Sequence, residues 1–182
     1  MGKLVVSEFV SLDGIAEDPG LEWAGQFDTG AEGGAFKMDE TMKSECLLFG
    51  RVTYEEFSRS WPNEQGEFAD KFNSLPKYVV SSTLRDPSWK NTTVLSGDLA
   101  EQVGKLKADA TGDVVVHGSP TLVHALLDQG LVDELRLIVY PIILGTGPKL
   151  FGPTGAHVKL RLASAQPIGP DGALLLIYRQ GL

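Results

Sequence analysis

The sequence predicts one α/β domain built around a mixed β-sheet, and three observations support this fold class. Short apolar strand patterns alternate with amphipathic helix patterns as far as Gly130, which is typical of βα units with parallel strand pairing. Between Glu134 and Arg179, further strand patterns are joined by Gly/Pro loops with no helix pattern between them, which predicts antiparallel strands. A chain of 182 residues fits one domain and can bury about 70% of its unfolded surface.

The first half of the chain alternates strands and helices. A strand is expected over Leu4–Ser11, followed by a Gly/Pro/acid-rich loop from Asp13 to about Gly34, and loops of this length are more often functional lids than linkers. A helix over Phe36–Glu45 is expected to point Phe36, Met38 and Met42 inward. The next elements are a strand over Cys46–Phe49, helices over Thr53–Ser60 and Glu67–Asn73, and strands over Lys77–Ser81 and Thr92–Leu95.

The second half contains the clearest helix start in the sequence. Ser119 fits an N-cap, Pro120 fits the first helical position, and Gly130 fits the stop. Before it, Asp98 fits the cap of a helix over Asp98–Ala108. The strands expected in this half are Asp113–His117, Glu134–Leu144, Val158–Ala165 and Ala173–Arg179.

Composition argues against several classes of function. The 16 basic and 24 acidic residues give a net charge of -8, which argues against nucleic acid or an anionic membrane as the main partner. The single cysteine, Cys46, excludes an internal disulfide and a multi-thiolate metal site, and the histidines show no metal spacing. No stretch approaches ~18 apolar residues, so no membrane span is expected. The N-terminal pattern is that of a strand rather than a signal peptide, and a cytoplasmic enzyme is expected.

Three strand-to-turn junctions form the candidate nucleotide site: Gly50–Thr53, Ser81–Thr83 and His117–Pro120. Two of them run from an apolar strand through a glycine into a helix, which places backbone N–H groups and a helix N-terminus where an anion can bind. Such ends in one α/β chain suggest a nucleotide with several phosphates. The G-x-G-x-x-G fingerprint is absent, so a standard Rossmann turn is not supported.

Each junction also has a purely structural interpretation. Arg51 offers a planar fork suited to phosphate but could equally be solvated, and Thr53 opens an S/T-x-x-E capping box. The hydroxyls of Ser81–Thr83, followed by Arg85, could bind a ribose 2′-phosphate or could simply close a turn. For His117, packing or hydrogen bonding at the strand end is favoured over proton transfer.

Two loops are candidates for the substrate side. The segment from Gly145 to Gly152 matches neither a Walker A loop nor a Rossmann turn, and its Pro148 has no N–H to donate, so it is interpreted as a loop lining a pocket, where Lys149 could meet an anionic substrate. Asp13 follows the first strand, at the sheet edge where ligands bind, so its carboxylate could orient or protonate a substrate, although Asp-Gly is also a common turn pair. Trp23 is interpreted as a lid aromatic or as an anchor for its loop.

In their order along the chain, these motifs resemble the dihydrofolate-reductase-like superfamily. The matching segments are Ser11-Leu12-Asp13-Gly14, Phe49-Gly50-Arg51-x-Thr53-Tyr54, Lys77-Tyr78-Val79-Val80-Ser81-Ser82-Thr83, His117-Gly118-Ser119 and Leu144-Gly145-x-Gly147-x-x-Leu150-Phe151. More closely, the chain looks like stand-alone relatives of the reductase domain of the bifunctional riboflavin-biosynthesis deaminase/reductase. The resemblance covers nearly the whole chain.

The resemblance implies one dihydrofolate-reductase-like domain over residues 1–182, with a mixed sheet of about eight to nine strands that binds NADPH across its strand ends. Carried over by position, Gly50, Arg51 and Thr53 would meet the cofactor phosphates, Ser81, Ser82 and Thr83 its adenosine end, and Gly118 and Ser119 its pyrophosphate. Asp13, Trp23, Gly145 and Gly147 would lie near the nicotinamide and a small-molecule substrate. No metal is implied.

Two hypotheses about function follow. The first is an NADPH-dependent reductase of a small heterocycle, pterin- or pyrimidine-like, and the alternative is a nucleotide-binding or sensing protein of the same fold without turnover. An ordinary Rossmann dehydrogenase is disfavoured by the missing fingerprint. A deaminase half is not expected, because the zinc-deaminase signature is absent from the sequence. Glu32, Asp39 and Glu40 are the candidates for a folate-binding carboxylate. Apolar tail strands with no later helix to cover them predict a two-fold homodimer, as is common in the resembling family.

Overall fold

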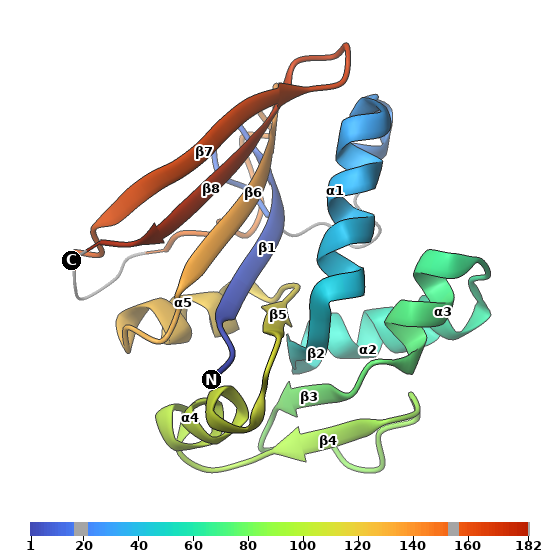
Figure 1. The fold of residues 1–182 in the computed structure, drawn as a ribbon, viewed down its shortest axis with the longest axis vertical. Coiled ribbons are helices and arrows are strands. Elements are labelled where there is room, and N and C mark those ends of the chain that lie inside the picture. Colours follow the sequence, from blue (N-terminus) through green and yellow to red (C-terminus); the bar gives the residue numbers. More distant parts are fainter. Residues whose placement is uncertain (17–21, 153–156, 182) are drawn as a thin grey trace.

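An eight-stranded mixed sheet organises the chain in the computed structural model, which describes residues 1–16, 22–152 and 157–181 (Figure 1). The strands are β1 (Leu4–Ser11), β2 (Ser44–Gly50), β3 (Lys77–Val80), β4 (Thr92–Leu95), β5 (Asp113–Val116), β6 (Glu134–Tyr140), β7 (Leu160–Ile168) and β8 (Ala173–Gln180). Their order across the sheet is β4-β3-β2-β5-β1-β6-β8-β7. All pairings from β4 to β6 are parallel, whereas β8 runs antiparallel to both β6 and β7. The expected mixed sheet is therefore confirmed.

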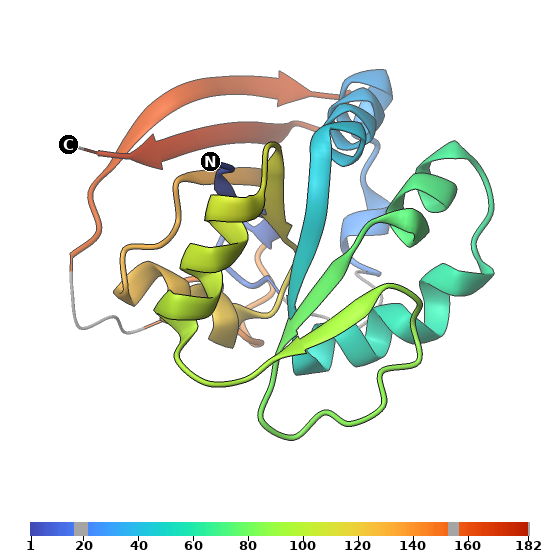
Figure 2. The same ribbon diagram turned by 60° about the horizontal axis from the view of Figure 1, so that its bottom comes forward.

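Helices cover both faces of the sheet. They are α1 (Gly30–Lys43), α2 (Arg51–Ser60), α3 (Glu67–Ser74), α4 (Leu99–Asp109) and α5 (Pro120–Asp128). Figure 2 shows α4 and α5 on one side of the central strands and α2 and α3 on the other. None of the helices in the described ranges is long and apolar enough to cross a membrane.

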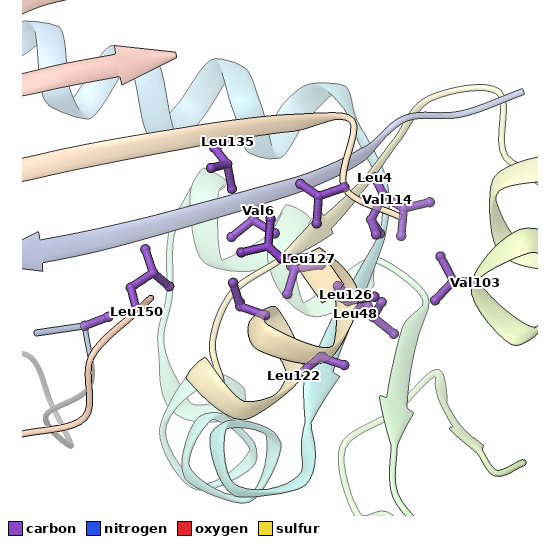
Figure 3. Close-up of a cluster of buried hydrophobic side chains, with 14 of the residues drawn as sticks. Leu4, Val6, Leu48, Val103, Val114, Leu122, Leu126, Leu127, Leu135 and Leu150 are labelled. Carbon is purple, nitrogen blue, oxygen red and sulfur yellow. The ribbon is translucent and has the colours of Figure 1, made fainter. Parts of the chain in front are cut away.

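The largest apolar cluster lies between the central strands and the pair α4 and α5. Figure 3 shows Leu4 and Val6 of β1 facing Leu126 of α5, with Val103 of α4 at the edge, and all four side chains are fully buried. Full burial of one such side chain contributes about 1.5–3 kcal/mol. Because β1 lies between two parallel neighbours, its carboxyl end and that of β5 meet at the same edge of the sheet, where α5 begins.

The start and the buried face of α1 differ from the sequence prediction. The helix begins at Gly30, within the predicted loop, and Met42 is 38% exposed instead of buried. The buried residues include Glu40 and Thr41, because the Glu40 carboxylate is paired inside the protein with Lys37 and Arg136. A burial pattern based on apolar residues could not anticipate a charged inward position.

Other boundaries also shifted. The capping-box interpretation of Thr53 is wrong, since α2 begins at Arg51 with Gly50 as its N-cap and Thr53 lies within the first turn. Ser119 occupies the N-cap position of α5, but its side chain makes no capping hydrogen bond. Asp98 does cap α4, with Oδ1 accepting from the Glu101 N–H at 2.8 Å. Residues 17–21 of the predicted lid lie outside the described residues.

Candidate active site

Two strand-to-helix turns pack directly against each other at the carboxyl ends of the neighbouring strands β2 and β5. A Cβ atom built on Gly50 would overlap the Ser119 hydroxyl oxygen, and one built on Gly118 would lie 2.5 Å from Thr53 Oγ1. Gly118 has a φ of +56°, a left-handed conformation that favours glycine, and its N–H donates to a carboxylate oxygen of Glu8 on β1. The structure thus brings together two of the three predicted junctions and places the N-termini of α2 and α5 side by side.

Arg51 lies at the first position of α2 with its side chain 44% exposed. Its guanidinium Nη1 donates to both carboxylate oxygens of Glu55, at 3.0 and 2.9 Å. This exposed i,i+4 pair is worth only about 0.3–0.5 kcal/mol, so a stronger anion could displace Glu55. The position of Arg51 agrees with the predicted phosphate contact, although its guanidinium group is bonded to Glu55 of the same helix.

The Ser81 hydroxyl closes a turn directly after β3. Ser81 Oγ accepts the N–H groups of Thr83 at 3.1 Å and Leu84 at 2.9 Å, which is the turn interpretation of this segment. Ser82 and Thr83 are exposed, and Arg85 donates to the Ser82 carbonyl at 3.2 Å. Two exposed side chains therefore remain available on a turn that is already closed.

Asp13 clamps two loops together. Its Oδ1 accepts from the Ser11 hydroxyl at 2.7 Å and from the Leu144 N–H at 3.1 Å, and its Oδ2 accepts from the Gly145 N–H at 2.8 Å. The Ser11 hydroxyl, then the Gly145 and Leu144 amides, lower the pKa of Asp13 to about 2. A carboxylate that stays ionised at neutral pH is a poor proton donor, so this geometry favours loop positioning over the acid role predicted from the sequence.

The clamped loop lies against the segment that follows β1. Ile15 and Lys149 form an isolated antiparallel bridge, and a Cβ on Gly147 would lie 2.7 Å from Ile15 Cγ2. Both Gly145 and Gly147 have positive φ values, +77° and +133°. The two loops assigned to the substrate side from the sequence are therefore in contact.

Trp23 is 4% exposed and packs edge-on against Tyr140 of β6, with ring centroids 5.5 Å apart. Its indole N–H is buried without a hydrogen-bond partner in the described part of the chain. A buried donor of this kind costs about 1–3 kcal/mol unless water or a ligand satisfies it. Packing agrees with the anchor interpretation, and the unpaired N–H adds a polar group at the substrate side.

A buried polar cluster under the site was missed by sequence reasoning. Ser7 of β1 lies beneath Lys37 and Glu40 of α1, with its hydroxyl donating to Glu40 Oε2 at 2.9 Å and 3.0 Å from Lys37 Nζ. The imidazole Nδ1 of His117 lies 3.3 Å from the Ser7 carbonyl oxygen. Arg136 of β6 joins the same carboxylate, with its Nη1 3.3 Å from Glu40 Oε1. Two titratable side chains from α1 and one from the end of β5 thus converge on one serine.

The charge states of this cluster follow from its burial. Burial opposes ionisation of Glu40, but the surrounding charges and hydrogen bonds, those of Lys37 first, together outweigh it and lower the pKa of Glu40 to about 2. For His117, burial and then the nearby Lys37 ammonium lower the pKa to about 3, so the imidazole is neutral at physiological pH. Of the three carboxylate candidates from the sequence, Glu40 is buried in ion pairs, Asp39 pairs with Lys43 at the surface at 2.7 Å, and Glu32 is exposed.

An open hollow of about 500 Å³ lies at the opposite edge of the sheet, around the amino ends of β2, β3 and β5. It is lined by Glu45, whose carboxylate already accepts from Thr111 and Gly112, and by the exposed Lys43 and the half-buried Lys71. Ligands of open α/β sheets bind outside the carboxyl ends of the strands, so this hollow is separate from the candidate site.

The fold and the paired turns define an α/β protein of the dihydrofolate-reductase-like class. The sequence profile of the RibD C-terminal domain matches residues 2–174, and the chain belongs to this family. It is 25% identical over 139 residues to the uncharacterized protein YyaP of Bacillus subtilis (strain 168), covering 74% of this chain and 73% of that one.

Solved structures agree on the fold. The chain is similar to a putative riboflavin biosynthesis protein from Shewanella sp. PV-4, with a TM-score of 0.79, 20% identity and 99% of each chain covered. It is also similar to dihydrofolate reductase from Enterococcus faecalis complexed with NADP(H), with a TM-score of 0.67, 13% identity, and 99% of this chain and 97% of that one covered. The family and these neighbours establish a reductase-type fold.

Proposed function

We propose that this protein is an NADPH-dependent reductase of a small pterin- or pyrimidine-like heterocycle. The observation that carries the proposal is the direct packing of Gly50 against Ser119 and of Gly118 against Thr53. This packing brings two helix N-termini to one edge of the sheet, and their partial positive charges favour a diphosphate. The neighbouring Enterococcus structure, which holds NADP(H), supports a dinucleotide rather than a simple anion.

The residues at the paired turns fit such a group. A side chain larger than hydrogen at position 50 or 118 would collide with Ser119 or Thr53, so both glycines allow the two turns to approach this closely. Under this proposal Arg51 and Thr53 bind phosphate oxygens, Ser119 sits at the pyrophosphate, and the exposed Ser82 and Thr83 face the adenosine end. When bound, the reduced nicotinamide supplies the hydride, and the protein orients the substrate and excludes water.

On the substrate side, Asp13 acts as a positioning residue. Its carboxylate fixes Leu144 and Gly145, which holds the Gly145–Gly147 loop beside the strand end where a nicotinamide would lie. The second candidate function, a nucleotide sensor without turnover, is favoured by the same observation, because the carboxylate expected to assist protonation is already engaged. Turnover separates the two candidates.

Titration of the protein with NADPH, followed by a panel of reducible pterins and pyrimidines, tests the proposal. A reductase binds NADPH and oxidises it only when one of these substrates is added. Tight binding of NADPH without oxidation by any member of the panel would support the sensor, and absence of NADPH binding would refute both candidates.

We also propose that the protein is a homodimer formed through β7 and β8. One face of this strand pair exposes Leu162 by 51%, Leu174 by 40% and Leu160 by 36%. Register places Leu162 opposite Tyr178 and Pro167 opposite Leu174, so these side chains share one apolar surface. In Figure 1 no helix covers the outer part of these strands. Apolar sheet faces of this kind usually become interfaces.

A further inference from the structure

His117 and Lys37 meet above a single residue of the central strand. His117 directly follows β5 and precedes the turn glycine Gly118, and Lys37 reaches down from the middle of α1. Both contact Ser7, His117 through the backbone carbonyl and Lys37 through the hydroxyl, at 3.3 and 3.0 Å. The pair therefore lies beside the proposed cofactor turn, on the face of the sheet that α1 covers.

The partner of His117 fixes its tautomer. A backbone carbonyl oxygen can only accept, so Nδ1 carries the proton and Nε2 presents a lone pair. The charged groups facing the ring are Lys37 and Glu40 from α1 and Arg136 from β6. Burial, then Lys37 and Arg136, lower the pKa of the imidazole, and they outweigh Glu40, which raises it. No side chain or backbone group among the described residues donates to Nε2, so the site contains an unused acceptor.

Lys37 provides the complementary donor. Two of its three ammonium protons are taken by Glu40 and Ser7, which orients the head group and leaves one proton for another acceptor. Glu40 is shared with Arg136, so the ammonium is held without being fully neutralised. The Lys37 side chain is 18% exposed, and aromatic rings border the pair, Phe9 with its centroid 5.6 Å from Lys37 Nζ and Phe72 with its centroid 5.7 Å from the His117 ring.

We propose that His117 and Lys37 form the polar end of the substrate pocket and bind the lactam edge of an oxo-heterocycle, with the ring N–H donating to His117 Nε2 and the adjacent carbonyl accepting from Lys37. This subsite rests on the proposed function, because it specifies the substrate class of the same site. A neutral acceptor beside a fixed cationic donor selects that edge against its N-alkylated form. An alkylated nitrogen has no proton to donate and leaves this acceptor unpaired.

The test compares lumazine, a pteridine dione with free lactam N–H groups, with 1,3-dimethyllumazine, which has none. Calorimetric titration of the full-length protein, with and without NADPH, gives both affinities. We expect lumazine to bind at least about 10-fold tighter, as the loss of one hydrogen bond within a binding site predicts. His117→Leu should bring the ratio close to one, whereas His117→Gln, which keeps an acceptor oxygen, should retain part of it. The matched control is His157→Leu, at an exposed histidine near β7, and it should leave the ratio unchanged.

Two further readouts separate binding from a merely structural role. The ratio in the wild type should be the same at about pH 5.5 and pH 7, because an ordinary histidine, with a pKa of about 6.5, would lose its acceptor over that interval and His117 would not. Lys37→Met should weaken lumazine binding and leave NADPH affinity within about twofold of the wild type, with near-UV circular dichroism confirming the fold. If the Met variant fails to fold, Lys37→Arg keeps the charge and should retain lumazine binding.

The outcomes distinguish this subsite from the proposed function. Equal affinity for the two lumazines in a wild type that binds NADPH overturns the subsite and leaves the reductase proposal standing. Failure to bind either lumazine overturns the lactam assignment. Discrimination between the lumazines by a protein that does not bind NADPH supports the subsite and refutes the cofactor.

Discussion

Replacing Gly118 with alanine tests the contact between the two strand-to-helix turns. Gly118 has a φ of +56°, and the left-handed conformation costs an L-residue about 1–2 kcal/mol. The new Cβ would also lie 2.5, 2.9 and 3.2 Å from Thr53 Oγ1, Cγ2 and Cβ, so rotating the Thr53 side chain cannot clear it. Overpacking of this kind costs about 1–3 kcal/mol. We therefore expect Gly118→Ala to lower the free energy of unfolding by about 2–5 kcal/mol.

Thr53→Ala separates the two contributions. In the Gly118→Ala background, Thr53→Ala removes the two atoms nearest to the new Cβ. The free energy lost to overpacking should therefore be recovered, whereas the cost of the left-handed backbone conformation should remain. The double-mutant cycle should therefore give a coupling energy of about 1–3 kcal/mol. Urea denaturation with an unchanged m-value measures each term. The matched control is Gly104→Ala in α4, where nothing lies within 4 Å of the added Cβ; it should be neutral or stabilising by up to about 1 kcal/mol.

A Gly118→Ala variant within about 0.5 kcal/mol of the wild type would refute the reasoning, because neither the strained backbone nor the contact could then be present. Strict additivity with Thr53→Ala would refute the contact alone and leave the backbone argument. Either result would also remove the observation that carries the proposed cofactor site.

Three further predictions concern binding, the loop clamp and assembly. Arg51→Ala should weaken NADPH binding about tenfold or more and NADH binding little, because in the wild type an Arg–phosphate bond worth about 1.5–3 kcal/mol replaces the weak surface pair with Glu55. Arg59→Ala is the control in the affinity titration. Equal losses of affinity for both cofactors would show that Arg51 does not bind the 2′-phosphate. Asp13→Asn should increase amide hydrogen exchange at Gly145. Because the pKa of Asp13 is lowered to about 2, its contribution to stability is present above about pH 4 and is lost as the pH falls towards 2. Acid titration of the wild type and the variant measures this difference. Sedimentation should give the mass of two chains, and Leu162→Lys should give that of one; a wild-type monomer at micromolar concentration contradicts the interface.

The positions of the strands and of the glycine turns along the chain were accessible from the sequence for local physical reasons. The strands are short apolar runs, and side chains that alternate or are wholly apolar report burial directly. Gly50 and Gly118 each end such a run immediately before a helix, so sequence spacing alone marks a close backbone approach. The N-cap of α4 at Asp98 was equally local, because its oxygen bonds an N–H three residues away.

The start of α1 and the role of Asp13 depended on residues far away in the chain. The helix begins at Gly30, where an added Cβ would lie 3.0 Å from the Cα atom of Gly169, so the first turn packs against a distant part of the chain despite its weak helix propensity. The hydrogen bond from the Leu144 N–H to Asp13 spans 131 residues. A local Asp-Gly pattern identifies a turn, but it cannot show which distant amides the carboxylate will bind.

The polar cluster at Ser7 could not be recognised from any motif, and its energetics indicate why it is there. Taking Glu40, Lys37 and Arg136 out of water costs several kcal/mol per ion, and buried ion pairs are often replaceable by apolar side chains at no loss of stability. Folding alone therefore gives no reason for a buried carboxylate between two cations. What the arrangement provides is position: Glu40 pairs with the Lys37 ammonium beside Ser7, and burial together with that positive charge keeps His117 neutral. A donor and an acceptor with fixed protonation states are thus held beside Gly118, and under the proposed subsite the stability given up to bury Glu40 is exchanged for selectivity.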